Sequence, residues 1–375
     1  MSLSRRQAMI ASVAALILLA LGGTVAALWW RGNAQDDLTG LIFAEFSARS
    51  DTIFVAPPDD PAKRTTIATV EHAEGWGLNP AIAPAGSKVA YTVPPPGSRP
   101  QADSPAELWL LDVRTKARQR IAGDADLRVA PVFDRNGSVL IYRSSTAGGQ
   151  QALVRVDVAS STRKPVVSVE TTFGIFPIGF ARDGALLYAS ISQQGTDIVR
   201  AVDGQPPTPL FRASDQVTRD WRLSPDGSML AYLAPEVTAE RVVHRLHVVR
   251  IEGVRVTPVP AAAAMPTSTD QYGAAWASDG SAVTVGREAA PDPRAGAIIV
   301  PLNGGQPVAL AAPTRGFDRP LMWSADGKAL VVHSFDGATA NAPGTESTAV
   351  ITSDGQRRVV TGSGDIIVFG WLSDA

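Results

Sequence analysis

Short apolar stretches alternate with turn residues along almost the whole chain, and they recur at a regular interval. The interval is marked by six tripeptides that end in glycine: Pro84-Ala85-Gly86, Arg135-Asn136-Gly137, Arg182-Asp183-Gly184, Pro225-Asp226-Gly227, Ser278-Asp279-Gly280 and Ala325-Asp326-Gly327. Successive glycines lie 51, 47, 43, 53 and 47 residues apart, and Ala375 follows the last one by 48 residues. A period in the forties is typical of β-propellers, in which each repeat is a four-stranded blade.

Each repeat has the same internal order, which the fourth copy shows well. A first strand ends at Leu223, a tight turn occupies Ser224 to Gly227, and β-rich residues follow at Met229 to Tyr232. Proline presets one turn position, aspartate bonds its own backbone, and glycine takes the positive-φ position. Third and fourth strands are expected at Leu246–Val249 and Thr257–Val259. The equivalent first strands end at Ile82, Phe133, Phe180, Leu223, Trp276, Trp323 and Trp371.

One repeat is divided between the two ends of the chain. Ile366–Phe369 supplies its first strand, and the sequence stops where the second should follow. Three strand-like segments near the other end, Leu41–Phe46, Thr52–Val55 and Thr65–Ala68, complete the set. Pairing the two ends in one blade closes the ring and removes an exposed sheet edge. We therefore predict an all-β, seven-bladed propeller over residues 40–375; six or eight blades would follow if one loop is misassigned.

The motif Ser-Pro-Asp-Gly-Ser followed by an apolar strand with tyrosine, at Ser224 to Tyr232, resembles the WD40-like (PD40) repeat of TolB-type β-propellers. The resemblance covers nearly all of the chain after its N-terminal segment and implies the propeller fold. It implies no functional residues. The chain differs from TolB in having no separate α/β domain ahead of the propeller, in its seven expected blades, and in its expected membrane anchor.

The N-terminal segment indicates where the propeller resides. Residues 7–30 form an uncharged stretch of 24 residues behind Arg5 and Arg6. As a helix this stretch would measure roughly 36 Å, enough to cross a bilayer core of about 30 Å. Trp29 and Trp30 are placed for an interfacial aromatic belt. We expect a cytoplasmic N-terminus over residues 1–6, a transmembrane anchor over 7–30, a linker over 31–39, and a propeller outside the cytoplasm.

A cleaved export signal is the alternative interpretation of this segment. Ser4-Arg5-Arg6-Gln7 resembles a twin-arginine motif, and Val25-Ala26-Ala27 is an acceptable cleavage site. The apolar stretch is longer than the 7–15 residues usual for a signal peptide, which favours the anchor.

Composition excludes several classes of protein. Hydrophobic residues make up 45% and charged residues 19%, which is not a disordered composition. A net charge of −2 and a pI near 6.1 argue against nucleic-acid binding. The chain has no cysteine, which excludes disulfides, cysteine-ligated zinc and thiol catalysis.

Candidate binding residues lie where the first strands begin, because those ends would surround the mouth of the central channel. They are Trp76, Arg128, Arg219, Asp220, Asp270, Tyr272, Asp318 and Arg319. The charges can neutralise one another as solvated salt bridges, or Asp220, Asp270 and Asp318 can hold a ligand or a metal. Three long loops are expected on the same face, at Thr92–Ala106, Arg287–Gly296 and Ser334–Ser347, either as plain surface insertions or as a partner-binding rim.

The other polar and aromatic residues favour structural roles. Asp183, Asp226, Asp279 and Asp326 are explained by turn chemistry, and the recurring Trp and Tyr are expected to pack between blades rather than stack on bases.

Catalytic constellations are poor. His244 and His247 would face opposite sides of a strand, and His72 and His333 are expected to be isolated. No nucleophile elbow, Walker loop or dinucleotide fingerprint occurs in the sequence.

These features favour a membrane-tethered, extracytoplasmic binding propeller without catalysis, metal or other cofactor, which uses its loop face to hold a protein or ligand. One alternative is a propeller hydrolase or lyase that acts on a lactone or sugar, with channel-mouth carboxylates around a divalent cation. Another is a sensor ectodomain, which could signal only through a membrane partner because so few residues would remain in the cytoplasm.

Overall fold

The computed structural model describes residues 38–372 except for 85–86, 102–103, 146–149, 172, 240, 261–268, 290 and 362–364. The expected cytoplasmic segment and membrane anchor, residues 1–30, and all but the end of the linker lie outside the described residues. Within the part of the chain that is described, no helix is long and apolar enough to cross a membrane. All the strands belong to one compact unit, Thr39–Ser373.

The first sheet joins the two ends of this unit. Its strands are, in order, β29 (Ile366–Leu372), β1 (Gly40–Phe46), β2 (Ser50–Ala56) and β3 (Thr65–Glu71). The β1–β29 ladder is antiparallel and runs from Gly40 opposite Leu372 to Glu45 opposite Ile366. The predicted pairing of N- and C-terminal strands is therefore confirmed. One edge of β29 is hydrogen-bonded to β1 and is not exposed.

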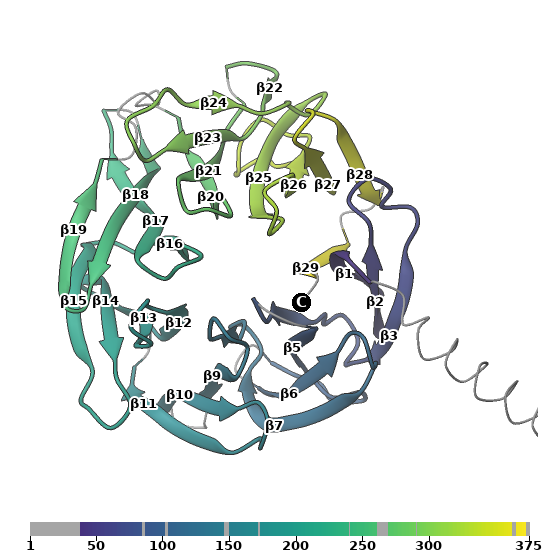
Figure 1. The fold of residues 1–375 in the computed structure, drawn as a ribbon, viewed down its shortest axis with the longest axis vertical. Helices are drawn as coiled ribbons and strands as arrows, with labels where there is room; N and C mark the ends of the chain where they lie inside the picture. The colour runs from purple at the N-terminus through teal and green to yellow at the C-terminus, as the bar shows by residue number, and fades with distance from the viewer. Residues whose placement is uncertain are drawn as a thin grey trace, which may run out of the picture. The chain divides into compact units, whose positions relative to one another are not determined.

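The remaining strands, apart from β22, form antiparallel meanders around the ring (Figure 1). One eight-stranded sheet contains β4 (Asn79–Ile82), β5 (Lys88–Val93), β6 (Pro105–Asp112), β7 (Arg118–Asp126), β8 (Val132–Phe133), β9 (Val139–Ser145), β10 (Gln150–Asp157) and β11 (Arg163–Glu170). Its two halves, β4–β7 and β8–β11, are joined by a single β7–β9 pair, Ala125 opposite Ser144.

Two four-stranded sheets follow. They contain β12 (Ile175–Phe180), β13 (Leu186–Ser192), β14 (Gly195–Ala201) and β15 (Thr208–Ser214), then β16 (Arg219–Leu223), β17 (Met229–Val237), β18 (Val242–Glu252) and β19 (Arg255–Val259).

The last two sheets complete the ring. One contains β20 (Gln271–Trp276), β21 (Ala282–Arg287), β23 (Ile298–Pro301) and β24 (Val308–Ala309), and the other contains β25 (Gly316–Trp323), β26 (Ala329–Phe335), β27 (Glu346–Thr352) and β28 (Arg357–Thr361) together with β22 (Arg294–Ala295). Every strand predicted from the repeat lies inside one of these elements, and the chain is a β-propeller.

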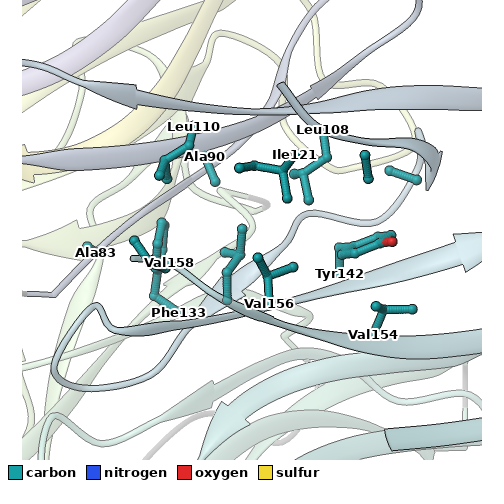
Figure 2. Close-up of a cluster of buried hydrophobic side chains, with 13 residues drawn as sticks. Ala83, Ala90, Leu108, Leu110, Ile121, Phe133, Tyr142, Val154, Val156 and Val158 are labelled. Atoms are coloured by element: carbon teal, nitrogen blue, oxygen red, sulfur yellow. The ribbon is translucent and has the colours of Figure 1, made fainter. Parts of the chain in front are cut away.

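The hydrophobic core lies between neighbouring sheets rather than in one central mass. Figure 2 shows one such cluster, where Leu108 and Ala90 of the β4–β7 half meet Phe133, Tyr142 and other residues of the β8–β11 half. A similar cluster spans the closure, because Leu41 and Phe43 of β1 pack with residues of β26 and β27. Strands buried on both faces explain the continuous apolar runs in the sequence.

Tryptophans at the ends of three first strands connect adjacent sheets by hydrogen bonds. Trp276 Nε1 donates to the carbonyl of Arg222 at 2.9 Å, and Trp323 Nε1 donates to Thr284 Oγ1 at 2.8 Å. Trp371 Nε1 of β29 donates to the carbonyl of Met322 on β25 at 3.3 Å. These contacts agree with the expectation that the recurring aromatics pack between blades.

The repeated turns follow the predicted chemistry. Asp226 accepts hydrogen bonds from both neighbouring serine hydroxyls, Ser224 and Ser228, and Gly227 has φ of 69°. Burial raises the pKa of Asp226, but the hydrogen bonds from Ser224 and Ser228 together lower it to about 2. The equivalent glycines at 137, 184, 280 and 327 also have positive φ.

The three long loops are shorter than predicted, since strands extend into both ends of each. The Thr92–Ala106 loop begins after Val93 and ends before Pro105. The expected loop Arg287–Gly296 contains β22, which pairs in parallel with the start of β25. The Ser334–Ser347 loop is confined to residues 336–345 and carries one isolated bridge, Thr339 to Ala342.

Candidate functional site

The connections at one end of the sheets are variable loops, and those at the other end are tight turns. In an antiparallel meander, successive connections alternate between ends. The loops from second to third strands, such as β5–β6, therefore share one end with the loops that lead into the next first strand, such as β3–β4. We name this end the loop face and the other end, with its tight aspartate turns, the turn face.

Three hollows lined by described residues open on the loop face. Their volumes are about 710, 520 and 450 Å³. A smaller hollow of about 230 Å³ lies on the turn face beside Asp183 and Gly253. These three hollows thus lie where the variable loops meet.

The largest of these three hollows lies between the β1–β2, β3–β4 and β5–β6 connections. It is lined by Arg49, Glu74, Trp76, the prolines at 96 and 100 and their neighbours. Arg49 and Glu74 form an exposed ion pair across it at 3.0 Å. Trp76 also lines the adjoining 450 Å³ hollow, so this candidate residue separates two concave sites.

A buried acid–base pair supports the floor of the largest hollow. Asp51 and His72 are almost wholly buried, and His72 Nε2 lies 3.0 Å from Asp51 Oδ1. His72 Nδ1 lies 2.9 Å from the carbonyl oxygen of Ala73, which can only accept a hydrogen bond, so Nδ1 is the donor in this contact. Burial raises the pKa of Asp51, although hydrogen bonds from Leu78 N–H and His72 oppose that effect.

Two histidines predicted to be isolated are in fact paired. His72 pairs with Asp51, and His333 on β26 lies 2.5 Å from Glu346 on β27. The carboxylate partners come from neighbouring strands, 21 and 13 residues away, so the sequence spacing did not reveal them. His244 and His247 contact different acids, Asp270 and Glu236, in line with the expectation that they do not share a ligand.

Arg128 stands with Trp76 at the 450 Å³ hollow. Its side chain is half exposed, and its backbone N–H is held by Asp126 Oδ1 at 2.8 Å. Asp126 also accepts from the buried Arg143 guanidinium at 2.7 Å. Burial lowers the pKa of Arg143, while the Asp126 carboxylate opposes that shift. Arg143 and Asp126 thereby fix the loop that presents Arg128 to solvent.

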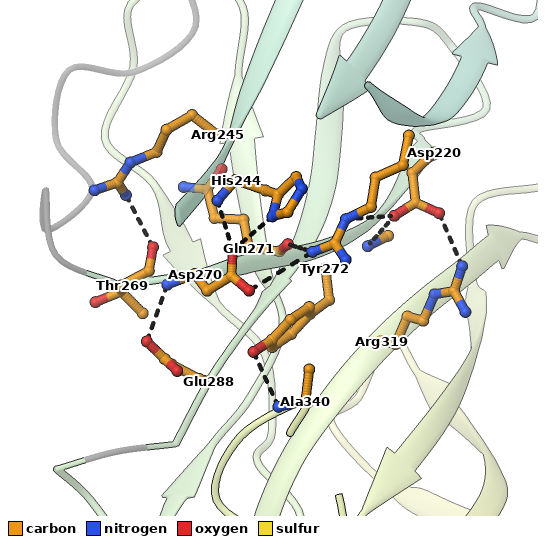
Figure 3. Close-up of polar contacts among 12 residues, drawn as sticks. Asp220, His244, Arg245, Thr269, Asp270, Gln271, Tyr272, Glu288, Arg319 and Ala340 are labelled. Atoms are coloured by element: carbon orange, nitrogen blue, oxygen red, sulfur yellow. Dashed lines mark hydrogen bonds and ion pairs between the residues drawn. The ribbon is translucent and has the colours of Figure 1, made fainter. Parts of the chain in front are cut away.

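Five of the predicted site residues come together on β16 and β25 and at the start of β20 (Figure 3). Arg319 Nη2 donates to Asp220 Oδ1 at 2.8 Å, and Arg219 lies 3.9 Å from the same carboxylate. Arg219 also donates to the carbonyl of Gln271 at 3.0 Å and lies over the ring of Tyr272. Its second acidic neighbour is Asp270, at 3.7 Å.

Asp220 has an unusual backbone conformation. Its φ of 55° is in the left-handed region, at a bulge where Arg219 faces Leu233 and Arg222 faces Ala231. Gly273 occupies the same place on β20, seven residues before the turn glycine, with φ of 63°. Asp220 Oδ2 accepts from the Gly273 N–H at 3.2 Å. A non-glycine residue held in this conformation costs about 1–3 kcal/mol and is found most often at functional positions.

Asp270 belongs to a second hydrogen-bonded group beside Arg219. Its Oδ1 accepts from the backbone N–H of His244, and its own N–H donates to Glu288 Oε1 at 3.1 Å. Glu288 is buried and pairs with Arg241. Burial raises the pKa of Asp270, but the hydrogen bonds from His244 and the Arg219 charge lower it overall. Asp270 is therefore a carboxylate that is already hydrogen-bonded to His244 and lies beside the Arg219 charge.

Asp318 does not join the other channel-mouth residues. It is fully buried, accepts from Ser334 Oγ at 2.8 Å, and pairs with Arg357. Burial raises the pKa of Asp318 to about 6, against the opposing charge of Arg357. The proposed convergence of Asp220, Asp270 and Asp318 is thus wrong, because one of the three points into the protein. Among the described residues, no three His, Asp or Glu side chains are grouped to hold a metal ion.

The 520 Å³ hollow on the loop face has an apolar rim that the sequence did not single out. Phe173, Val217 and Val242 line it, with exposed fractions of 46%, 54% and 50%. Val237, 76% exposed, ends β17 at the same connection. We call these four residues the apolar rim. The sequence alone could not identify these four residues as a group, because they come from loops some 25–45 residues apart that meet only in the folded protein.

Comparisons with known proteins agree with the propeller fold. No family model matches the chain, and no curated protein matches it. The structure is similar to TolB from Acinetobacter baumannii, with a TM-score of 0.51 and 18% identity over 74% of this chain. The chain spans 64% of the length of that protein.

Two other solved structures are similar over more of the chain. One is an oligogalacturonate lyase in complex with manganese, with a TM-score of 0.53, 16% identity, and coverage of 85% of this chain and 84% of the lyase. The other is the β-propeller domain of the Trilobed protease from Pyrococcus furiosus, with a TM-score of 0.53, 14% identity, and coverage of 88% and 97%. That domain has an open velcro topology, whereas β1 and β29 pair here. At these identities the likenesses show the fold alone.

Proposed function

We propose that residues 40–375 form a seven-bladed, non-enzymatic propeller that binds a protein partner through its loop face. The observation that carries the proposal is the apolar rim around the 520 Å³ hollow. Of the seven large hydrophobic side chains that are exposed among the described residues, three line this hollow and a fourth, Val237, ends the adjoining strand β17. Clustered exposed apolar residues beside a concavity are typical of protein-binding surfaces.

The energetics of the apolar rim suit a protein partner. Fully burying a valine or phenylalanine side chain contributes about 1.5–3 kcal/mol. Phe173, Val217, Val237 and Val242 are each about half buried or less, so a covering partner can remove much of their remaining apolar area from water. The polar residues Gln193 and Asp215 also line this hollow, and their hydrogen bonds to a partner would fix its orientation.

The count of seven blades is supported by the order of the sheets. If the two halves of the eight-stranded sheet are taken as separate blades, each of the seven units has four strands in meander order. The short β22 would then be an addition to the blade β25–β28 rather than a blade of its own.

Membrane tethering is the second component of the proposal. Residues 7–30 would anchor the protein, 1–6 would remain in the cytoplasm, and 31–39 would link the anchor to the propeller on the extracytoplasmic side. The support is the charge and hydropathy pattern of the sequence, with Arg5 and Arg6 before the apolar stretch and Asp36 and Asp37 after it.

Capture of partners by chemical crosslinking from native membranes tests the proposal. The full-length protein is compared with Phe173→Asp and Val217→Asp, which place charge in the apolar rim. Val254→Asp is the matched control, because Val254 is 68% exposed at the β18–β19 turn on the turn face. We expect one partner to be lost from both rim variants and retained by the control. Equal capture by all four proteins would contradict the proposal.

The alternative is a propeller hydrolase or lyase. It is favoured by the two carboxylates at the channel mouth, Asp220 and Asp270, on a fold similar to that of a manganese-containing lyase. Metal analysis and Ca²⁺ or Mn²⁺ titration of the purified protein, with Asp220→Asn beside it, test this alternative. Metal-dependent turnover of a uronide or lactone that Asp220→Asn abolishes would favour the enzyme; turnover unchanged in that variant would remove these carboxylates from the reaction.

A further inference from the structure

Three arginines share the wall of the central channel near Asp220. Arg219 and Arg222 lie on β16 and Arg319 lies on β25, and each of these is the first strand of its blade. β16 pairs only with β17, so its other edge faces the channel. Arg222 is exposed, and the side chains of Arg219 and Arg319 are 38% and 43% exposed.

Arg222 lies on β16 close enough to Asp220 and Arg319 for their charges to act on it. Although Arg222 is open to solvent, the protein around it removes enough water to lower its pKa by desolvation. The nearby charge of Asp220 opposes this shift, and the like charge of Arg319 adds to it. Charges that are partly desolvated by the surrounding protein interact more strongly than fully hydrated charges.

The positive charge of these three guanidinium groups exceeds the negative charge of the carboxylates beside them. Asp220 is the shared neighbour of all three arginines; burial raises its pKa, but their combined charge lowers it overall, so it is ionised. Asp270 is near Arg219 but is also hydrogen-bonded to His244. Three positive charges therefore face two carboxylates, one of which is shared with a histidine.

Hydrogen-bond donors also remain available. A guanidinium has five N–H donors. Arg222 Nη1 donates to the carbonyl of Trp221 at 3.1 Å, and Arg319 Nη2 donates to Asp220. The cluster thus combines surplus positive charge with donors in the fork arrangement that matches carboxylates and phosphates.

We propose that Arg219, Arg222 and Arg319 form an oxyanion-binding site in the channel, which takes the carboxylate or phosphate group of a small ligand. Asp220 positions the site: its strained bulge directs its carboxylate towards Arg319 and the Gly273 N–H. The site does not require the partner proposed for the loop face, and either can exist without the other.

Isothermal titration of the full-length protein in detergent tests the site, with inorganic phosphate and succinate as separate probes at low ionic strength. Arg222→Gln and Arg319→Gln remove one charge each. Arg250→Gln is the matched control, because Arg250 is an exposed arginine at the turn-face end of β18. Thermal unfolding without either probe verifies that each variant is folded.

We expect at least one probe to bind the wild-type protein and the Arg250→Gln variant equally. Affinity should fall at least tenfold in Arg222→Gln and in Arg319→Gln, and it should weaken as salt rises from about 50 mM to about 500 mM. The probe that binds identifies the group as phosphate or carboxylate. Absence of binding by both probes, or unchanged affinity in folded Arg222→Gln, would overturn the proposal.

Discussion

The backbone conformation of Asp220 predicts that glycine is more stable than alanine at this position, the reverse of the usual order in a strand. Because φ is 55° at this residue, a Cβ atom there is strained whatever side chain it carries. Replacing Asp220 by alanine removes the carboxylate and keeps the strain. Replacing it by glycine removes the carboxylate and the strain together. The two variants lose the same contacts to Arg319 and Gly273, so their difference isolates the backbone.

The expected difference follows from two opposing quantities. Left-handed backbone costs a residue with a Cβ about 1–2 kcal/mol. Glycine adds freedom to the unfolded chain, which costs about 0.4–1 kcal/mol of stability. Asp220→Gly should therefore be more stable than Asp220→Ala by about 1 kcal/mol. At a residue with ordinary strand geometry, glycine would be the less stable by about 0.5–1 kcal/mol.

Urea unfolding followed by tryptophan fluorescence measures this difference, and the chain has eight tryptophans to report it. The comparison needs only the two midpoints and a common slope. If the alanine variant is as stable as the glycine variant or more stable, the strained bulge at Asp220 is refuted, and with it the positioning role that we give to this residue.

Three further predictions concern the scaffold. Phe43→Ala, at a fully buried residue in the closure core, should lower the free energy of unfolding by about 3–5 kcal/mol in urea titration; a loss below about 1 kcal/mol would contradict the packing across the closure. Gly316→Ala should prevent folding or destabilise strongly, since its Cβ would lie 1.8 Å from the Phe335 carbonyl oxygen, whereas Gly253→Ala, with open space and φ of 63°, should cost about 1 kcal/mol in thermal unfolding. The folded pKa of Asp226, about 2, is below its unfolded value near 3.8, so its stabilisation is present above pH 4 and lost as pH falls towards 2; Asp226→Asn should be less stable than wild type at pH 7, and the gap should close in acid.

The strands were predictable because their determinants are local. The turn at Ser224 to Gly227 uses residues whose preferences hold in any context, and its glycine sits at a constant offset from the first strand. The predicted strand ends match the structure at Leu223 and Trp276, and differ by one residue at the C-terminus, where β29 extends to Leu372.

The site was less predictable because its contacts join different blades. Arg319 and Asp220 are 99 residues apart, and their pairing depends on the curvature of the ring. Asp318 lies near the start of a first strand, as Asp220 and Asp270 do. Its side chain is nevertheless buried against Arg357, which lies on another strand. The position of Asp220, seven residues before its turn glycine, did carry a signal, since Gly273 occupies the same offset in the next repeat.

Site-specific photo-crosslinking in native membranes tests the central claim, partner binding at the loop face, most directly. A photoreactive amino acid is placed at Val217 in the apolar rim, and separately at Val254 on the turn face; both side chains are exposed. We predict one discrete protein adduct from position 217, competed away by excess unlabelled wild-type protein, and none from position 254. No adduct from 217, or the same adduct from both positions, would contradict a partner-binding loop face.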